Sequence, residues 1–539
     1  MQCYDAIIIG AGVNGLVAAA RLSRRGLAVL VLERDEQLGG MAASKNLSPD
    51  VISPGATLAS GYIPPALLHE LDLGRHGLRL MRQEGGVSFF AGEQGEPARY
   101  VASYRNPLAQ RKEFARLSKR DGDAWQRFQR DMKKAVAAVE AGLLHQPTDP
   151  MARRFGRLKE FGNLARQAVS QSPEHLYEQS KLWTLSMDDL LSEYFVSEEI
   201  KAHIAAPALV GAAMSPLAPT SASLLVPQWL GHQQAHARGM PDQFTAMGGQ
   251  PALVKALESV IKAHQGEIRL EAEVTDVRLK DKKADGVVLA DGEEISARVI
   301  LSDLDLKRSY LNLFEWSSLP KEFVEDVGNF RMEGTCARLN LVLEGSLTFP
   351  SLPRGCPAIA GGFRLPGSLS QLDHAFDDWL EKMPPREILV DASIPSLSDP
   401  TLAPAGQHIL SANVQYVPGS LNVDEWTPAR RTALEKQIVE KMSIASPGIA
   451  SQIVASELLL PSDLEERTGV TKGDLTYGQV GLDQMFFNRP LPNIGHYASP
   501  VKHFYVCSAS MHPGPMALGA AGSNAAQAVL HALKVGESA

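Results

Sequence analysis

The chain has 539 residues, of which 44% are hydrophobic and 21% charged, and its 53 basic and 61 acidic residues give a formal net charge of −8. This composition is typical of a globular protein and lacks the basic footprint that general binding to nucleic acid requires. Four scattered cysteines argue against a disulfide framework and a metal site, and no apolar run is long enough to span a membrane, so we expect a cytoplasmic protein.

The first predicted unit is a strand, a glycine-rich turn, a helix and a second strand. An apolar, β-branched run at 6–9 is typical of a buried parallel strand, and an Ala- and Leu-rich pattern predicts a helix over 13–25, which Gly26 closes. A second apolar strand at 28–32 ends at Glu33. A glycine turn in this setting favours a dinucleotide site over an ordinary turn.

The turn itself reads G-x-G-x-x-G at Gly10, Gly12 and Gly15. The first glycine allows a tight turn, the second lets a pyrophosphate approach the backbone, and the third lets the helix pack close to the strand. The helix start offers free N–H groups to phosphates, and Glu33 can accept hydrogen bonds from the adenosine ribose. We therefore expect the turn and the helix start to contact the cofactor at Gly10, Gly12, Val13, Asn14 and Gly15.

A second pair of glycines follows the acid, in the stretch Arg34-Asp35-Glu36-Gln37-Leu38-Gly39-Gly40-Met41. This stretch resembles the E-R-x-x-x-x-G-G extension of the amine oxidase and phytoene desaturase flavoproteins. The resemblance implies FAD rather than NAD, with the extension running along the diphosphate and the flavin ring. An ordinary Gly-Gly turn is the alternative. The implied contacts are Glu33, Arg34, Gly39, Gly40 and Met41.

The next part of the chain, 85–240, is mostly helical in pattern, and we expect it to form a helical cap of the substrate domain. Within it, residues 151–166 are interpreted as a surface helix; the alternative is an interfacial helix through which a lipophilic substrate enters from a membrane. Residues 204–231 are apolar but contain four prolines, so they cannot form one long helix. They suit a buried, irregular pocket wall, with plain core as the alternative.

Residues 245–305 return to the cofactor pattern, with a Met-Gly-Gly turn, a helix, a strand through Val274, a charged hairpin and an Asp-Gly turn. This order resembles the central cofactor segment of the same flavoproteins. By that resemblance, Val274 contacts the adenine through its backbone. Farther on, alternation at 336–343 predicts one strand of a mixed sheet, which would form the floor of the substrate cavity.

The last cofactor segment spans 504–533 and contains a buried strand, a loop and a helix that we expect to start near Ser523. In the loop, His512 is the candidate acid or base, with a structural role as the alternative. Just upstream, Gln484 and Arg489 are candidates to orient substrate or bind flavin, with a salt bridge or a helix cap as the alternative. The expected cofactor contacts of this segment are Ser508, Ser510, Gly519, Asn524 and Ala525.

Six stretches spread over nearly the whole chain together resemble the pyridine nucleotide-disulfide oxidoreductase domain-containing protein 2 family, a branch of the phytoene desaturase-like flavoproteins. They are NGLVAAARL (14–22), ELDLGRHGLRL (70–80), SKRDGDAWQRF (118–128), DPTLAPAGQHILSANVQYVP (399–418), GDLTYGQVGLDQMFFNRPLP (473–492) and SASMHPG (508–514). The chain departs from that family at Val13 and Pro515, where the family more often has His and Gly. A disulfide reductase needs a redox-active cysteine pair and a second dinucleotide loop, and the sequence shows neither.

The sequence thus predicts an α/β protein with a discontinuous Rossmann-like FAD-binding domain, a mixed-sheet substrate domain and a helical cap. The FAD-binding domain comprises three separated segments, 1–84, 241–310 and 476–539. The cap and the substrate domain comprise 85–240 and 311–475.

The predicted function is an FAD-dependent oxidoreductase that oxidises or desaturates a lipophilic small molecule by hydride transfer to the flavin. Because no nicotinamide site is found, the reduced flavin needs an external acceptor, oxygen or a quinone. Two alternatives stay open: a flavin-dependent isomerase or saturase, and a non-catalytic flavin-fold scaffold that binds a protein partner. The substrate and the oligomeric state are not assigned by the sequence.

Overall fold

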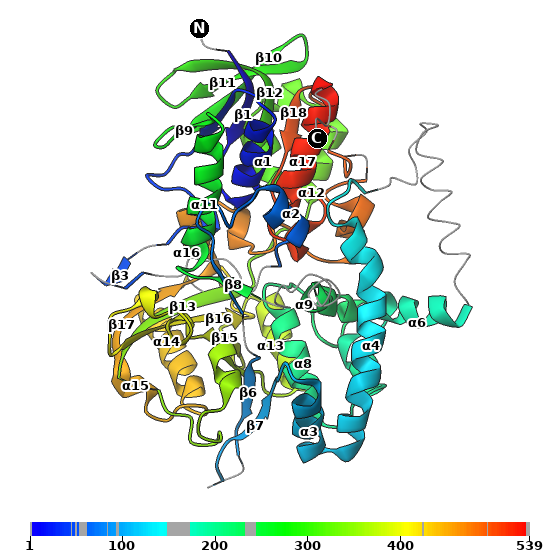
Figure 1. The fold of residues 1–539 in the computed structure, drawn as a ribbon, viewed down its shortest axis with the longest axis vertical. Helices are drawn as coiled ribbons and strands as arrows, with labels where there is room; N and C mark the ends of the chain where they lie inside the picture. The colour runs from blue at the N-terminus through cyan, green and yellow to red at the C-terminus, as the bar shows by residue number, and fades with distance from the viewer. Residues whose placement is uncertain are drawn as a thin grey trace.

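A computed structural model describes residues 3–44, 46–48, 51–52, 62–82, 85–92, 96–147, 173–231, 244–345, 347–422, 425–492, 494–497 and 499–534. Within these residues most strands belong to two seven-stranded sheets, one in each half of the molecule. Figure 1 shows the first sheet with its helices in the upper half and the second below it. The chain passes between the halves several times, so each half is assembled from separated segments.

The first sheet is the predicted dinucleotide-binding sheet. Its order is β10-β11-β12-β1-β2-β9, with β18 pairing in parallel with the end of β12. Both β2 and β12 pair in parallel with β1, in a register that sets Leu32 and Ser302 beside Ile9. The residues that follow these three strands therefore meet at one edge of the sheet. The strands are β1 (Cys3–Ile9), β2 (Val29–Leu32), β9 (Glu267–Arg269), β10 (Val274–Lys280), β11 (Lys283–Leu289), β12 (Glu294–Ser302) and β18 (Phe504–Val506).

Three helices pack together on this sheet. The central one, α1 (Val13–Arg24), lies against α11 (Gln250–Ala263) and α17 (Ala520–Leu533). Figure 1 shows the first and last helices of the chain side by side. Their backbones touch, because a Cβ atom added to Gly522 would lie 2.0 Å from the Asn14 carbonyl oxygen. The three cofactor segments of the sequence thus form one unit around α1.

The second sheet is mixed, as predicted. Its order is β17-β13-β16-β15-β14-β6-β7, and all its pairs are antiparallel except β14 with β6. One face is apolar and packs on α14 (Pro428–Met442) and α15 (Ile449–Gln452). The strands are β6 (Val87–Phe90), β7 (Arg99–Ala102), β13 (Cys336–Glu344), β14 (Phe363–Leu365), β15 (Leu389–Ser393), β16 (Gln407–Gln415) and β17 (Ile453–Leu459).

Helices flank the second sheet on the side that Figure 1 shows in cyan and green. An aromatic cluster joins them, in which the rings of Phe114, Trp125, Phe128, Phe195 and Trp229 pack on one another, mostly edge to face or tilted. These helices are α3 (Pro107–Leu117), α4 (Lys119–Gly142), α6 (Pro173–Thr184), α7 (Met187–Ser192), α8 (Glu198–Leu209) and α9 (Val226–Trp229). The remaining elements are α2 (Pro65–Glu70), α12 (Lys321–Asn329), α13 (Leu369–Leu380), α16 (Pro461–Thr468) and the short pairs β3 (Asn46–Ser48) with β4 (Val51–Ile52) and β5 (Leu80–Arg82) with β8 (Phe244–Ala246).

The structure confirms the predicted α/β class and changes two details. The last helix begins at Ala520, three residues before the predicted Ser523, because Gly519 with a φ of 79° turns the chain into it. The predicted cap begins with β6 and β7, which pair with the mixed sheet instead of joining the helices. The amphipathic stretch 151–166 lies outside the described residues.

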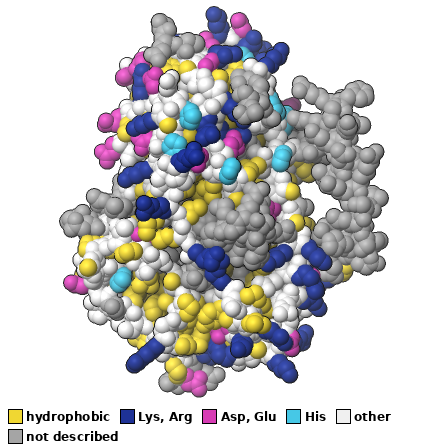
Figure 2. All heavy atoms as spheres, in the orientation of Figure 1, with side chains coloured by type: hydrophobic (Ala, Val, Ile, Leu, Met, Phe, Trp, Pro, Cys, Tyr) yellow, Lys and Arg dark blue, Asp and Glu magenta, His cyan; other side chains and the backbone are white. Residues whose placement is uncertain are grey.

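Charge is spread over the surface of the described part of the molecule. On the face drawn in Figure 2, Lys and Arg side chains alternate with Asp and Glu side chains over the upper half. Among the described helices, none has the length and apolar character needed to cross a membrane.

Candidate cofactor and substrate sites

The glycine turn lies where β1 ends and α1 begins. Gly10 has a φ of 89°, a conformation that side chains disfavour, and Gly12 caps α1 without any side-chain hydrogen bond. A Cβ atom added to Gly15 would lie 2.5 Å from the Gly10 carbonyl oxygen, so the helix start and the turn are in direct backbone contact. Gly10, Ala11 and Gly12 of this turn line a cleft beside the helix start, where a diphosphate is expected.

Glu33 stands beside this turn at the end of β2. Its Oε2 accepts a hydrogen bond from the Ala11 N–H at 2.7 Å, and its Oε1 accepts one from the Asp35 N–H at 3.1 Å. Burial raises the pKa of the Glu33 carboxyl above its ordinary value. The carboxylate is therefore held by backbone donors at the edge of the sheet, where a ribose can reach it.

The second glycine pair packs on the first. The Gly39 N–H donates to the Ala11 carbonyl oxygen at 2.9 Å, and both Gly39 and Gly40 have positive φ values, of 122° and 55°. A Cβ atom on Gly39 would lie 2.9 Å from the Ala43 nitrogen. The Gly39-Gly40 stretch thus contributes backbone to the wall beside the glycine turn. This position favours the cofactor interpretation over an ordinary Gly-Gly turn.

These segments enclose a cleft with an empty volume of about 670 Å³. Seven of the residues predicted to contact the cofactor line it: Gly10, Gly12, Glu33, Arg34, Gly40, Met41 and Val274. Residues that the sequence reasoning missed also line it, among them Asp303, Asp305, Arg308, Thr468 and Tyr477. The glycine-turn backbone and two arginines can donate to phosphates, and the Glu33 carboxylate can accept from ribose hydroxyls, so the lining fits the adenosine diphosphate part of FAD.

Asp303 is the most notable missed residue, because its side chain lies directly on the glycine turn. It follows β12, and its N–H donates to the Ile9 carbonyl oxygen at 2.8 Å. The carboxyl accepts hydrogen bonds from the Gly12 and Gly15 N–H groups, yet burial and the nearby Glu33 charge raise its pKa from 3.8 to about 8. Only the parallel pairing of β12 with β1 reveals this neighbour, since 290 residues separate the two segments.

The predicted contacts outside the cleft serve mainly to join α17 and its preceding loop to the rest of the molecule. Asn14 Oδ1 accepts from the Gly522 N–H at 3.3 Å, and Asn524 Nδ2 donates to the Leu143 carbonyl oxygen at 3.0 Å. Ser510 Oγ donates to the Tyr477 carbonyl oxygen at 3.0 Å. The remaining predicted residues away from the cleft lining are Val13, Gly15, Gly39, Ser508, Gly519 and Ala525. Their cofactor contacts stay predictions.

His512, the candidate acid or base, is buried in the loop before α17. Its Nε2 lies 3.4 Å from the Gly142 carbonyl oxygen, and its own carbonyl accepts from the Tyr497 hydroxyl. Burial lowers the pKa of His512 to about 4, so the ring is neutral at physiological pH. It lines neither the cofactor cleft nor the substrate cavity. These contacts favour the structural alternative, and a catalytic role stays a prediction.

Arg489 and Gln484 are held by main-chain groups, and their predicted substrate or flavin contacts stay predictions. The Arg489 guanidinium is fully buried and donates to main-chain carbonyls, including those of Ala509 at 2.8 Å and Thr476 at 2.9 Å. Gln484 Oε1 accepts from the Arg331 N–H at 2.8 Å. Neither a salt bridge nor a helix cap describes this arrangement, which ties the C-terminal loop to the segment before it.

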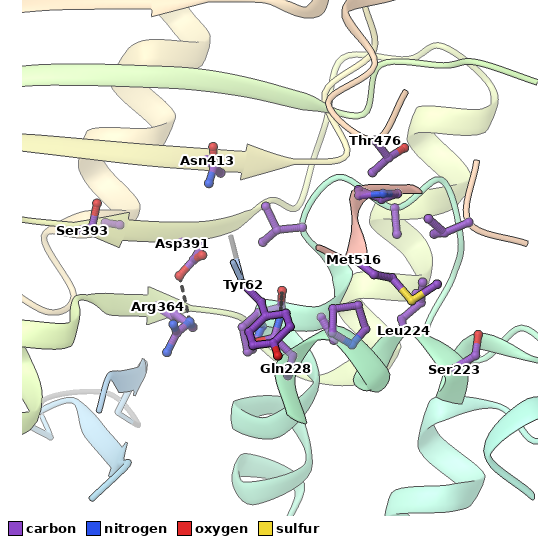
Figure 3. Close-up of a pocket in the computed structure, with 18 of the residues that line it drawn as sticks. Tyr62, Ser223, Leu224, Gln228, Arg364, Asp391, Ser393, Asn413, Thr476 and Met516 are labelled. Atoms are coloured by element: carbon purple, nitrogen blue, oxygen red, sulfur yellow. Dashed lines mark hydrogen bonds and ion pairs between the residues drawn. The ribbon is translucent and has the colours of Figure 1, made fainter. Parts of the chain in front are cut away.

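A second cavity lies between the mixed sheet and the helices, with an empty volume of about 1210 Å³. The stretch 204–231 lines one wall through α8, α9 and the turn between them, as predicted for an irregular pocket wall. The mixed sheet lines the opposite wall, as predicted for a cavity floor. Figure 3 shows Arg364, Asp391, Ser393 and Asn413 on the strands, across from Leu224 and Met516. Met516 and Pro515 come from the loop before α17, so this cavity reaches the cofactor half.

Cysteine and metal chemistry find no support in the described residues. Cys336, Cys356 and Cys507 are buried and do not form disulfides with one another. Burial raises the pKa of the Cys336 thiol to about 12, which opposes a reactive thiolate. Within the same part of the chain, His, Cys, Asp and Glu side chains form no group of three that could hold a metal ion.

Comparisons with known proteins match this picture. Residues 14–529 match the model of the flavin containing amine oxidoreductase family. The pyridine nucleotide-disulfide oxidoreductase domain-containing protein 2 of Rattus norvegicus is 30% identical over 98% of this chain and 94% of its own length. The neurosporene-forming phytoene desaturase of Rhodobacter capsulatus is 27% identical over 57% of this chain and 54% of its own length.

Two solved structures share the fold. An oxidoreductase from Methanosarcina mazei has a TM-score of 0.57 at 18% identity and covers 98% of this chain and 99% of its own. Wild-type putrescine oxidase bound to putrescine has a TM-score of 0.57 at 15% identity, covering 99% of each chain. The chain belongs to the flavin containing amine oxidoreductase family and is an FAD-dependent oxidoreductase that acts on a small molecule.

Proposed function

We propose that this enzyme oxidises or desaturates a lipophilic small molecule and passes the electrons to oxygen or a quinone. One observation carries the proposal, namely the apolar wall of the second cavity. Pro207, Val210, Leu224, Met485 and Met516 face its interior, and they come from the cap helices and from the loops of the cofactor half. A cavity with an apolar wall that touches both halves suits a substrate that is held by hydrophobic contact beside the cofactor.

The residues of this chain bind and shield the reacting part of such a substrate. Leu224 and Met516 offer apolar contact surface and exclude water from the end of the cavity next to the loop before α17. Bound FAD supplies the redox step by accepting a hydride from a C–H bond of the substrate. The protein therefore needs to orient the substrate, and no ionisable catalytic side chain is required of the wall.

The proposed electron acceptor follows from the nucleotide sites. The sequence contains one G-x-G-x-x-G turn after a strand, and that turn lines the cleft assigned to FAD. A second nucleotide cofactor, such as NADH or NADPH, would need a similar phosphate-binding loop of its own. Oxygen or a quinone is therefore the proposed partner of the reduced enzyme.

The test is reduction of the bound flavin under anaerobic conditions. The purified FAD-loaded protein is mixed with polyenes and with lipophilic amines, and the flavin absorbance is followed without added reductant. We expect bleaching by a compound of one of these classes and recovery when oxygen or a soluble quinone is admitted. Product formation that leaves the flavin oxidised throughout would instead indicate an isomerase, and a need for added reductant would indicate a saturase.

A further inference from the structure

One face of the mixed sheet carries a row of polar side chains toward the second cavity. Arg364, Asp391, Asn413 and Arg338 stand directly opposite one another on β14, β15, β16 and β13. All four line the cavity. The Arg364 Nε lies 2.8 Å from the Asp391 Oδ1, and the Arg338 Nη1 donates to the Asn413 Oδ1 at 2.9 Å. A buried sheet face usually carries apolar side chains, so this row marks the floor as a place for a polar group.

The row also has an excess of positive charge. Its members contribute two guanidinium groups and one carboxylate, and among the described residues that line the cavity there is no other Asp, Glu, Lys or Arg side chain. The Asp391 carboxylate pairs with Arg364, and the second guanidinium, that of Arg338, bonds to the neutral amide of Asn413. Burial lowers the pKa of the Arg338 guanidinium to about 10, opposed by the charges of Asp391 and Glu457, so Arg338 is protonated at neutral pH.

The polar row faces an apolar wall across the cavity. Figure 3 places Arg364, Asp391 and Asn413 on the sheet side and Leu224 and Met516 on the opposite side. The two ends of the space thus differ in chemistry, one apolar and next to the loop before α17, the other cationic and on the sheet. A ligand that satisfies both ends has an apolar body and an anionic head.

We propose that the substrate is an amphipathic carboxylate, with its apolar body against Leu224 and Met516 and its carboxylate on the polar row at Arg338. A carboxylate accepts hydrogen bonds from a guanidinium in matched geometry, and it offsets the charge that the row carries. This inference rests on the proposed function, because it identifies the substrate class of the same cavity. It also assigns Arg338 and Asn413 to substrate recognition, in which the apolar end presents the reacting bond to the cofactor half.

The first experiment compares head groups on one apolar chain. Octanoate, octanamide, octanol and octylamine are titrated into the FAD-loaded wild-type protein by isothermal titration calorimetry. We expect octanoate to bind about 10- to 100-fold more tightly than octanol, as for a hydrogen-bonded charged group, and octylamine to bind most weakly. This comparison needs no altered protein.

The second experiment changes the charge of the row. Asn413→Asp is nearly isosteric and places a carboxylate directly opposite Arg338, so it should remove the preference for octanoate while octanol binding changes little. Arg338→Gln should remove the same preference, and Arg338→Lys should restore part of it. Arg75→Gln, at an arginine that is 85% exposed and outside the cavity lining, is the matched control and should keep the preference. Retained FAD content shows that each variant is folded.

Equal binding of octanoate and octanol, tighter binding of octylamine, or no binding of any probe to the wild type would overturn the proposal. So would an unchanged octanoate preference in a folded Asn413→Asp protein. The proposed function fails separately. If octanoate is preferred but neither polyenes, lipophilic amines nor apolar acids bleach the flavin, the head-group site stands and the redox proposal falls. If bleaching occurs without octanoate preference, the reverse holds.

Discussion

The two cavities of this enzyme are built from different parts of the polypeptide. The cofactor cleft combines the glycine backbone at Gly10, Gly12 and Gly40 with charged side chains around it. The substrate cavity is lined by side chains, whose identity can change without changing the strands and helices that carry them. Close backbone contact with a cofactor requires glycines at fixed spacing. A cavity lined by side chains requires only that strands and helices place suitable residues around it. The cleft therefore points to the family, and the cavity carries the proposed substrate preference.

The largest expected effect comes from filling the backbone contact in the cofactor cleft. Gly15→Ala adds a Cβ atom 2.5 Å from the Gly10 carbonyl oxygen, so the turn must move. We expect loss of bound FAD and destabilisation of about 1–3 kcal/mol, as for other overpacked sites. The flavin-to-protein ratio after purification and the thermal unfolding midpoint measure these effects.

Gly74→Ala is the matched control for that substitution. Its added Cβ atom meets no heavy atom within 4 Å, and its φ is compatible with a side chain. It should keep FAD and stability. If Gly15→Ala binds FAD as the wild type does, the cleft assigned to the cofactor is wrong.

The second prediction concerns the Asp303 carboxyl, which lies on the glycine turn. Because burial raises the Asp303 pKa from 3.8 to about 8, its protonated form adds stability that is complete below the unfolded-state pKa and is lost as pH rises through about 8. A diphosphate beside the carboxyl disfavours ionisation further, so FAD affinity should fall by up to about tenfold per pH unit above about pH 8.

Asp303→Asn should remove this pH dependence, because the amide oxygen still accepts from the Gly12 and Gly15 N–H groups but carries no charge. Titration of the apoprotein with FAD, followed by fluorescence between about pH 6 and about pH 10, measures the affinity. A steep alkaline loss that persists in Asp303→Asn would show that another group is responsible. The Glu33 carboxyl, whose pKa is also raised by burial, is the next group to test by Glu33→Gln.

The smallest effect belongs to the apolar wall. Leu224→Ala removes buried surface from the substrate cavity, and we expect octanoate and octanol to bind about 3- to 10-fold more weakly, by the same factor for both probes. Leu217→Ala, at a leucine that is 39% exposed, should change neither. FAD content should stay at the wild-type level in both proteins. An effect on octanoate alone would contradict the division of the cavity into an apolar wall and a polar floor.

Much of the cofactor half was predictable because its signals are local. The helix predicted over 13–25 is observed over Val13–Arg24, and the strand predicted at 6–9 lies within Cys3–Ile9. The 204–231 stretch, recognised by its prolines, does line the substrate cavity. The expected cofactor contacts of the C-terminal segment stay predictions. Ser510 and Asn524 bond to the main chain of other segments, because the loop before α17 is held by long-range packing that no local pattern reports.

The polar floor could have been read in part from the sequence. Polar and apolar residues alternate through Arg338 and Asn340 on β13 and through Ser411 and Asn413 on β16. Such alternation ordinarily predicts one solvated face. The structure shows all four residues buried, so the polar face looks into a cavity instead of solvent. Burial of that face depends on the cap helices, which are distant in sequence.

The sequence by itself determined the cofactor and the family, through glycines whose spacing is dictated by close backbone contact with a diphosphate and a neighbouring helix. Only the tertiary structure brought Asp303 onto the glycine turn, because that contact depends on β12 pairing with β1. Only the tertiary structure aligned Arg364, Asp391, Asn413 and Arg338, because strand register sets which side chains stand opposite one another. A turn is specified by consecutive residues, so the sequence predicts it. The alignment of side chains across four strands depends on strand pairing, which no consecutive residues specify.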